Sequence, residues 1–208
     1  MEKIFNLIIA DESGSMCVIA REALAGLNET LSSCRQMQEK YPDMEQCVTL
    51  VTFDSDHYKM HYDNVPAVQT ETLAASAYQP GGATPLYDAI GKGIARIMAQ
   101  AETNDKVLVT IITDGEENCS KEYNLTMVKR LIEKQKEAGW TFSLIGTENL
   151  DVEGMANSMA IDNHLCFPQD EEGTKAMFIR ENNARARFNQ FCCMNASMPK
   201  GSLFEEDE

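Results

Sequence analysis

Apolar runs, several of them rich in β-branched residues, recur along this chain and are separated by segments of helical spacing. The runs read KIFNLIIA at 3–10, CVTLVTF at 47–53, KVLVTIIT at 106–113, WTFSLIG at 140–146 and IDNHLCF at 161–167. Near-continuous apolar runs of this kind are typical of strands that are covered on both faces. Their alternation with helices predicts an α/β fold: an open, mostly parallel, doubly wound (Rossmann-like) sheet with helices on both faces.

The segments between these runs carry apolar residues at steps of three and four, which is the spacing of amphipathic helices. This spacing predicts helices at about 16–38, 86–101, 121–138, 151–159 and 171–193. A further run, HYKMHYDNV at 57–65, follows the second strand after a short acidic turn and predicts a hairpin partner for it. We therefore expect the sheet to end in one antiparallel edge strand.

The length of 208 residues is enough for one sizeable core, and no linker or internal repeat divides the chain. We therefore expect a single domain over 1–195. The remaining residues, 196–208, end in LFEEDE and are expected to form an acidic, disordered tail.

The overall charge and the cysteines narrow the classes of partner and compartment. A formal net charge of −15 argues against a nucleic-acid partner, because binding to phosphates requires a surplus of lysine and arginine. No apolar segment approaches the roughly 20 residues that cross a bilayer, so no membrane span is expected. The N-terminal apolar stretch runs directly into acids without a cleavage site, and the seven cysteines form no C-x-x-C pair. These features predict a cytoplasmic protein with reduced thiols.

Side chains that carry oxygen follow the predicted strands at the points where ligand sites form. In open α/β sheets, ligands bind at the carboxyl ends of the strands. There the sequence places two carboxylates and three hydroxyls: Asp11, Ser13, Ser15, Thr84 and Asp114. An all-oxygen set suits a hard cation such as Mg²⁺, with Mn²⁺ and Ca²⁺ as alternatives, and the lack of histidine and cysteine argues against zinc.

The charge of this set matters as much as its chemistry. Asp11 and Asp114 together neutralise one divalent ion, while the three hydroxyls add no charge. An ion held in this way keeps the capacity to accept one more anionic oxygen from outside. The set therefore predicts an open metal site that captures a carboxylate.

The same residues carry a family resemblance. D-x-S-x-S at 11–15, a threonine after the glycine-rich GGATP at 81–85 and T-D-G at 113–115 resemble the von Willebrand factor A domain and its metal-ion-dependent adhesion site. The similarity extends over about 1–192, because the order of strands and helices also fits. GGATPLYDAIG and FSLIGTENLDVEGMA are most similar to small intracellular bacterial members of that family.

The resemblance implies roles for the motif residues. Ser13 and Ser15 would coordinate the ion directly, whereas Thr84, Asp11 and Asp114 would exchange between direct and water-bridged contact. A glutamate or aspartate of a partner protein would complete the coordination shell. The function it implies is a Mg²⁺-dependent protein-binding module and not an enzyme.

Two other functions compete with this interpretation. Phosphoryl-transfer hydrolases also use an aspartate at the end of a first strand beside Mg²⁺, which here would be Asp11. They need a second aspartate two residues later, where this chain has Ser13. In the other alternative, the metal is purely structural and the domain is a scaffold.

Three of the motif residues also have a structural interpretation. Ser15 and Thr84 stand where they could cap helices, and Asp114 with Gly115 forms a common turn dipeptide. We expect these residues to bind a metal because all of them fall at strand ends in one family's order.

Some other residues carry weaker expectations. Glu12 is expected to point to solvent near the ion. His57 and His61 lie on one strand about 13 Å apart, too far for chelation. The last predicted helix carries three arginines that are expected to form a solvated basic face: Arg180, Arg185 and Arg187.

Overall fold

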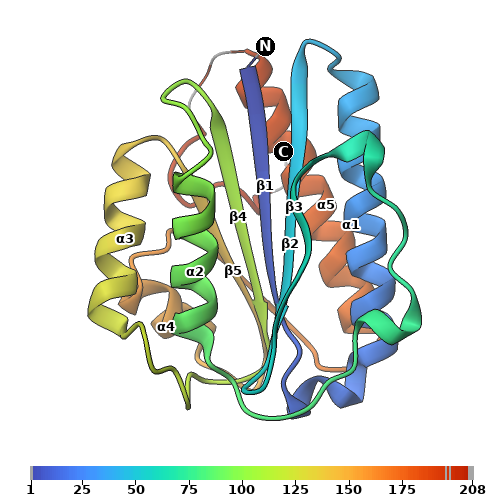
Figure 1. The fold of residues 1–208 in the computed structure, drawn as a ribbon, viewed down its shortest axis with the longest axis vertical. Coiled ribbons are helices and arrows are strands. Elements are labelled where there is room, and N and C mark those ends of the chain that lie inside the picture. The colour runs from blue at the N-terminus through green and yellow to red at the C-terminus, as the bar shows by residue number, and fades with distance from the viewer. Residues whose placement is uncertain (1, 195, 197, 206–208) are drawn as a thin grey trace.

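The computed structural model describes residues 2–194, 196 and 198–205, which form one six-stranded sheet in the order β3-β2-β1-β4-β5-β6 (Figure 1). The strands are β1 (Glu2–Asp11), β2 (Met44–Phe53), β3 (Tyr58–Pro66), β4 (Lys106–Thr113), β5 (Thr141–Thr147) and β6 (Asn163–Phe167). Neighbouring strands are parallel except for β2 and β3, which pair antiparallel. The prediction of a mostly parallel sheet with one antiparallel edge strand is therefore confirmed.

Helices cover both faces of the sheet. They are α1 (Ala20–Lys40), α2 (Leu86–Met98), α3 (Leu125–Glu137), α4 (Val152–Ser158) and α5 (Glu171–Cys193), with short 3-10 turns η1 (Gly14–Ile19), η2 (Ala67–Gln69) and η3 (Ala75–Ala77). In Figure 1, α2, α3 and α4 lie on one side of the sheet, while α1 and α5 lie together on the other. The doubly wound arrangement is confirmed.

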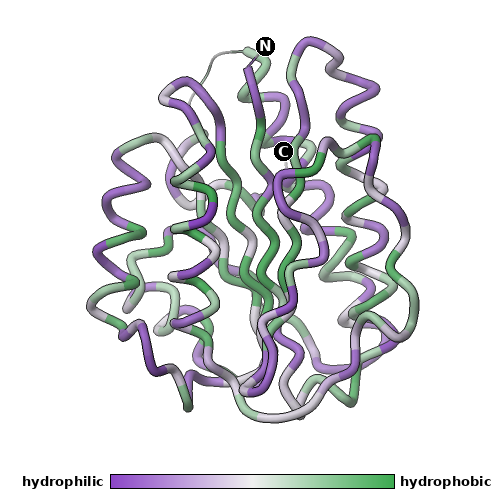
Figure 2. The backbone as a smooth tube through the Cα atoms, in the orientation of Figure 1, coloured by the Kyte–Doolittle hydropathy of each residue, from purple (hydrophilic) through white to green (hydrophobic). Residues whose placement is uncertain are grey.

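The core consists of two apolar layers that share the strands between them. Along β1, Phe5, Leu7 and Ile9 face the α2–α3 side, whereas Ile8 and Ala10 face the α1–α5 side. Successive side chains of a strand point to opposite faces, so a strand covered on both sides must be apolar throughout. Figure 2 accordingly shows the central strands as the most hydrophobic part of the chain.

Two helices begin later than their apolar spacing predicts, because contacts with other segments hold the residues before them: Gly82 contacts Gly14, and the Asp88 carboxylate accepts hydrogen bonds from the backbone N–H groups at 121–123. The helix expected from Met16 begins at Ala20, since 14–19 form η1, in which Gly14 N donates to Gly82 O (3.1 Å). The helix expected from 121 begins at Leu125, after Asn124, whose side chain accepts a hydrogen bond from Met127 N in the manner of an N-cap.

The last helix carries an arginine that is buried rather than solvated. Arg185 was expected on a basic outer face, but it is 0% exposed and donates to Asn6 Oδ1 (2.6 Å) and to the Glu181 carboxylate. Residues four apart share one face of a helix, and Glu181 and Arg185 share the face that packs on the sheet. The expected basic face therefore does not form as predicted, because Arg185 points inward while Arg180 is exposed.

Part of the expected tail is also packed. Leu203 is buried beside Ala184 and Phe188, and its N–H donates to Asn163 Oδ1 (3.1 Å). The expected disorder therefore does not extend over the whole segment from 196, because an apolar side chain and a hydrogen bond anchor it. Residues 206–208, which carry the last acids of the expected tail, lie outside the described residues.

Within the described part, no helix is long and apolar enough to cross a membrane.

Candidate metal centre

The carboxyl ends of the neighbouring strands β1 and β4 lie at the topological switch point of the sheet, where the strand order reverses. β1 is paired with β2 on one side and with β4 on the other, and the chain fills these two sides in turn. Loops that leave such neighbouring strands run apart and leave a crevice, which is the usual ligand site of an open α/β sheet. Asp11 is the last residue of β1 and Asp114 directly follows β4. The carboxyl ends of these two strands lie at the bottom of the view in Figure 1.

Hydrogen bonds connect four of the five residues that the sequence singles out. Ser15 Oγ donates to Asp114 Oδ1 (2.6 Å), and Ser13 Oγ lies 3.2 Å from Ser15 Oγ. Ser13 N donates to Asp11 Oδ1 (2.7 Å), which bends the chain sharply after β1. The D-x-S-x-S segment therefore turns its oxygens toward the residue that follows β4.

Thr84, the fifth residue, is buried on the loop that leads into α2. Asn118 holds its backbone at two points: Thr84 N donates to Asn118 Oδ1 (2.9 Å), and Asn118 N donates to Thr84 O (3.1 Å). A Cβ added to Gly115 would lie only 3.0 Å from Thr84 Oγ1. The Thr84 hydroxyl thus lies beside the residue after Asp114, and all five predicted residues converge at one edge of the sheet.

This geometry disfavours the capping interpretation of the two hydroxyl residues. The Ser15 hydroxyl is directed at Asp114 rather than at a helix N–H. At the start of α2 the N-cap position is held by Pro85, and no side chain caps the helix there. Neither Ser15 nor Thr84 is therefore explained by a helix cap.

The two carboxylates are buried, and no basic side chain in the described part of the chain pairs with them. Burial raises the pKa of Asp11 to about 6, although the Thr113 hydroxyl, which donates to Asp11 Oδ2 (2.6 Å), opposes this rise. Burial likewise raises the pKa of Asp114. Among the described residues, no lysine, arginine or histidine forms an ion pair with either of these aspartates. Buried like charges without a counterion are costly, so this arrangement favours a bound cation.

Gln169 is a site residue that the sequence analysis missed. It follows β6, and its Nε2 donates to Asp114 Oδ2 (2.5 Å) and to Ser15 O (3.3 Å). Its own Oε1 accepts a hydrogen bond from Asn149 Nδ2 (3.2 Å). The position after a strand end could have identified it, but nothing in the neighbouring residues marks a glutamine as a contact of Asp114.

Glu12 does not point to solvent as expected. It is 0% exposed, and its Oε1 accepts hydrogen bonds from Lys59 Nζ (2.7 Å) and Gln79 N (2.5 Å). The expectation was wrong because the loop at 78–83 covers this side chain, and that loop is distant in sequence. His57 and His61 contact different partners, Asp54 and Thr52, and do not act as a pair.

The donor set fits a hard divalent cation. It offers two carboxylates and three hydroxyls, and the described residues contain no cluster of three or more His, Cys, Asp or Glu that could hold a metal. A carboxylate cage and a zinc-type site are therefore not formed by these residues. Mg²⁺ is commonly held by one or two carboxylates with water and substrate oxygens in the remaining positions.

Fold and site together define an α/β domain with a cluster of side-chain oxygens at the switch point of its sheet. The profile of the von Willebrand factor type A domain family matches residues 7–181, and the chain belongs to this family. Domains of this family generally mediate contacts between proteins. No curated protein sequence matches the chain.

Solved structures share the fold at low sequence identity. The vWF domain of the type V pili tip protein Mfa5 from Porphyromonas gingivalis has a TM-score of 0.62 at 10% identity, covering 96% of this chain and 98% of that one. The SpRpn10 VWA domain has a TM-score of 0.59 at 11% identity, covering 87% and 95%. The PilB minor pilin from Streptococcus sanguinis has a TM-score of 0.62 at 12% identity and covers 96% of this chain, which spans 64% of that pilin.

Proposed function

We propose that this domain is a Mg²⁺-dependent protein-binding module that captures an acidic side chain of a partner. The proposed metal ligands are Asp11, Ser13, Ser15, Thr84 and Asp114, with Mn²⁺ and Ca²⁺ as alternatives to Mg²⁺. Membership in the von Willebrand factor type A family supports a role in protein binding rather than in catalysis.

One observation carries the proposal: two buried carboxylates, with no ion pair to a basic side chain of the described residues, lie among three hydroxyls at the carboxyl ends of β1 and β4. Asp11 and Asp114 supply two negative charges, and Ser13, Ser15 and Thr84 supply neutral oxygens. The two aspartates balance the charge of a bound divalent ion. The ion can then still coordinate one further carboxylate oxygen. Ser15 is exposed, so an acidic side chain of a partner can approach the site from solvent.

A selection from a library of random peptides tests this function. Peptides bound to the immobilised domain in Mg²⁺ and released by EDTA should share an aspartate or glutamate. The Asp114→Ala variant serves as the control and should retain none of them, because it lacks one of the two charges that hold the ion. Replacing the shared acid by its amide should abolish binding of a selected peptide to the unchanged domain.

Three outcomes would contradict the proposal and favour something else. Peptides that bind equally well in EDTA would place the docking surface elsewhere. Stabilisation by Mg²⁺ without any acid-dependent ligand would favour a structural metal and a scaffold. Turnover of a phosphate ester that is lost in Asp11→Asn would favour the hydrolase.

We also propose a reducing, cytoplasmic environment. All seven cysteines are free thiols, and three of them, Cys17, Cys166 and Cys193, are exposed. Exposed unpaired thiols persist in reducing compartments, whereas secreted domains of oxidising compartments commonly pair them.

A further inference from the structure

A third buried carboxylate, that of Glu12, is adjacent to the candidate metal centre. Glu12 is buried, and in the sequence it lies between the proposed ligands Asp11 and Ser13. Consecutive residues of one loop contact both acids: the hydroxyl of Tyr78 donates to Asp11 O (2.5 Å), and Gln79 N donates to Glu12 Oε1 (2.5 Å). Three negative charges therefore share one neighbourhood, although the charge balance of the proposed site requires only two.

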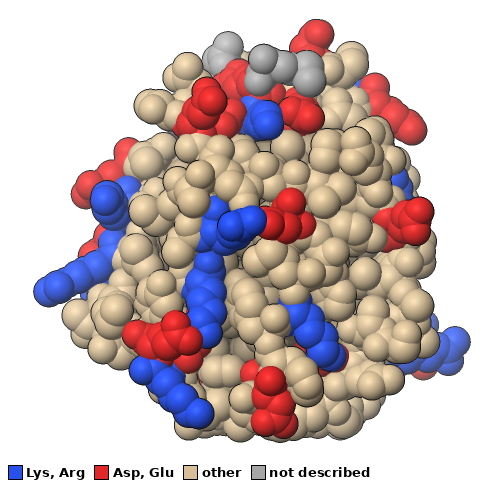
Figure 3. Space-filling view, in the orientation of Figure 1, with Lys and Arg blue, Asp and Glu red and all other residues tan. Residues whose placement is uncertain are grey.

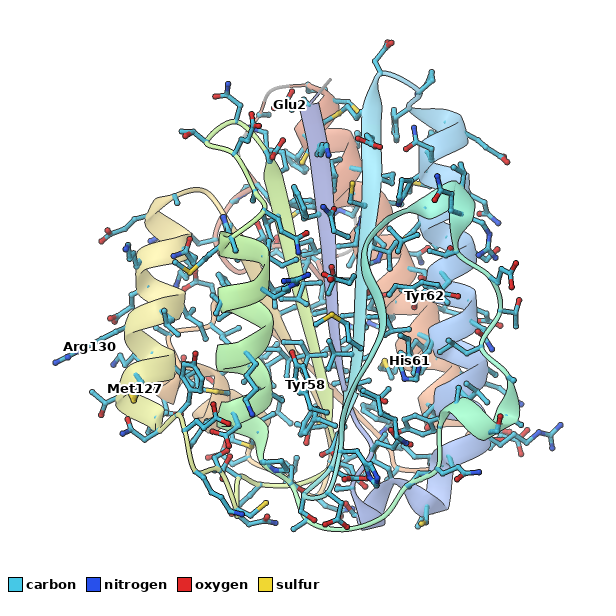
Figure 4. All side chains as sticks on the ribbon, in the orientation of Figure 1. Glu2, Tyr58, His61, Tyr62, Met127 and Arg130 are labelled. Atoms are coloured by element: carbon cyan, nitrogen blue, oxygen red, sulfur yellow. The ribbon has the colours of Figure 1, made fainter. Side chains whose placement is uncertain are left out.

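A lysine from the edge strand pairs with this third carboxylate. Lys59 Nζ donates to Glu12 Oε1 at 2.7 Å, while Glu12 Oε2 is buried and accepts no hydrogen bond from the described residues. Lys59 lies on β3 between Tyr58 and His61, which Figure 4 labels. Its side chain is 33% exposed, so its ammonium reaches the buried acid from the solvent side.

The pair also anchors the loop that delivers Thr84. Glu12 Oε1 accepts a hydrogen bond from Gln79 N (2.5 Å), and Glu12 O accepts one from Gly81 N (2.9 Å). Ser55 Oγ accepts a hydrogen bond from Ala83 N (3.1 Å) on the same loop. A neutral glutamine at position 12 could accept the same bond from Gln79 N, so the negative charge is not needed for anchoring alone.

We infer that Lys59 sets the charge of the metal site: its ammonium cancels Glu12, so that a divalent ion meets two negative charges and not three. The inference rests on the proposed function. With two charges, the loaded site is neutral and a partner's acid is not repelled. With three, the ion would bind more tightly, but the site would carry a net negative charge and would repel the acid.

Two single variants and their combination test this inference. Lys59→Met leaves Glu12 uncompensated, so Mn²⁺ affinity should rise roughly three- to tenfold, and the affinity for an acidic peptide should fall. Glu12→Gln leaves the lysine uncompensated, so Mn²⁺ affinity should fall. The double variant Glu12→Gln/Lys59→Met restores the balance and should bind Mn²⁺ within about twofold of the unchanged protein.

The measurement is a calorimetric titration with Mn²⁺ alone, at low ionic strength because salt screens such effects. Lys3→Met is the matched control: Lys3 also pairs with a glutamate, Glu45 (3.5 Å), but it lies at the start of β1, at the opposite end of the strand from Asp11. Its Mn²⁺ affinity should not change. Thermal melts of every variant in EDTA show whether each one folds.

The signs of the changes decide the inference. If Lys59→Met and Glu12→Gln both lower the Mn²⁺ affinity, and the double variant has a lower affinity than either, the inference is overturned. The ion pair would then only hold the loop at 78–83 in place. If the unchanged protein binds no Mn²⁺, the proposed function falls separately. The melts in EDTA would then still test the charge pairing, because Lys59→Met must melt below the double variant if Glu12 depends on Lys59.

Discussion

Asp11 is a carboxylate held where water cannot reach it, at the end of the central strand β1. Its pKa of about 6, raised by burial, means that the folded protein disfavours the ionised form that prevails at neutral pH. The ordinary pKa of 3.8 applies to the unfolded chain. Without a cation, the residue therefore destabilises the fold at pH 7, and this cost is relieved as the pH falls from about 6 toward 4.

Asp11→Asn should accordingly stabilise the metal-free protein while abolishing its response to metal. In EDTA at pH 7 the free energy of unfolding should rise by about 1–3 kcal/mol, because the variant removes a buried charge. The gain over the unchanged protein should shrink as the pH is lowered from 7 to 5. Addition of Mg²⁺ should raise the melting temperature of the unchanged protein but not that of the variant. A variant that loses stability in EDTA would contradict this account of the site.

Gly115 gives a steric test of the position of Thr84. In Gly115→Ala the new Cβ would meet Thr84 Oγ1 at 3.0 Å, so the hydroxyl must move and Mn²⁺ affinity should fall about tenfold. Gly81→Ala is the matched control, since its Cβ would meet nothing within 4 Å and its N–H still donates to Glu12 O. Calorimetric titration of both variants checks the prediction. Equal affinities in the two would mean that Thr84 does not take part in binding the metal.

The residues missed by the sequence analysis share one physical cause. Asp11, Ser13 and Ser15 form a local pattern at the end of the first predicted strand, Thr84 stands on the loop before a predicted helix, and Asp114 follows another predicted strand. Their convergence at one edge of the sheet followed from the topology. The orientation of Glu12 depends on Lys59, which lies 47 residues further along the chain. The role of Gln169 depends on a contact with Asp114 across 55 residues. Such contacts leave no periodic signal in the sequence.

At the scale of secondary-structure elements, periodicity predicted the strands well and the helix boundaries less well. The expected strand at 106–113 and the expected helix at 171–193 coincide with β4 and α5. The start of α1 is displaced because the D-x-S-x-S segment is held by contacts to other loops. A local sequence pattern cannot report bonds that form only when distant loops meet.

α5 is the helix whose buried face is hardest to predict from the sequence. Its inner face includes the charged residues Glu181 and Arg185 and the polar Asn189, all of them buried. Asn189 Oδ1 accepts a hydrogen bond from Gln46 Nε2 (2.6 Å), and Arg185 Nη2 donates to Thr110 Oγ1 (3.1 Å). Polar residues on β2 and β4 thus contact polar residues on α5. The hydrophobic pattern alone predicts that this polar face of α5 is exposed to solvent.

Removal of one member of the α5 ion pair should be strongly destabilising. Arg185→Met leaves Glu181 buried without its cation, so the free energy of unfolding should fall by about 3–5 kcal/mol in urea denaturation. Replacing both residues, as in Glu181→Leu/Arg185→Met, should cost less than the single change, because no charge remains buried. Arg180→Met on the exposed side of the same helix is the control and should change stability by less than about 0.5 kcal/mol. A double variant less stable than the single one would show that hydrogen bonds of the pair outweigh its burial cost.

At the scale of the whole molecule, the candidate metal centre and the packed C-terminal segment occupy opposite ends of the sheet. Asp11 and Asp114 lie at the carboxyl ends of β1 and β4, whereas Leu203 packs near Ile4 and Leu108, close to the beginnings of the same strands. Acidic and basic side chains are interspersed on the face shown in Figure 3. Because the metal centre and the packed C-terminal segment lie at opposite ends of the sheet, changes in C-terminal packing should not affect metal binding.

Leu203→Ala tests this separation. Loss of the buried side chain beside Ala184 and Phe188 should lower the free energy of unfolding by about 2–4 kcal/mol, because a cavity is left between α5 and the sheet. Mn²⁺ affinity, measured by calorimetry at a temperature where the variant remains folded, should be unchanged, since every proposed ligand lies at the far edge. A fall in affinity that accompanies the fall in stability would mean that α5 transmits the change along its length to Gln169 and Asp114. The two ends of the molecule would then form one cooperative unit, contrary to the independence that the geometry predicts.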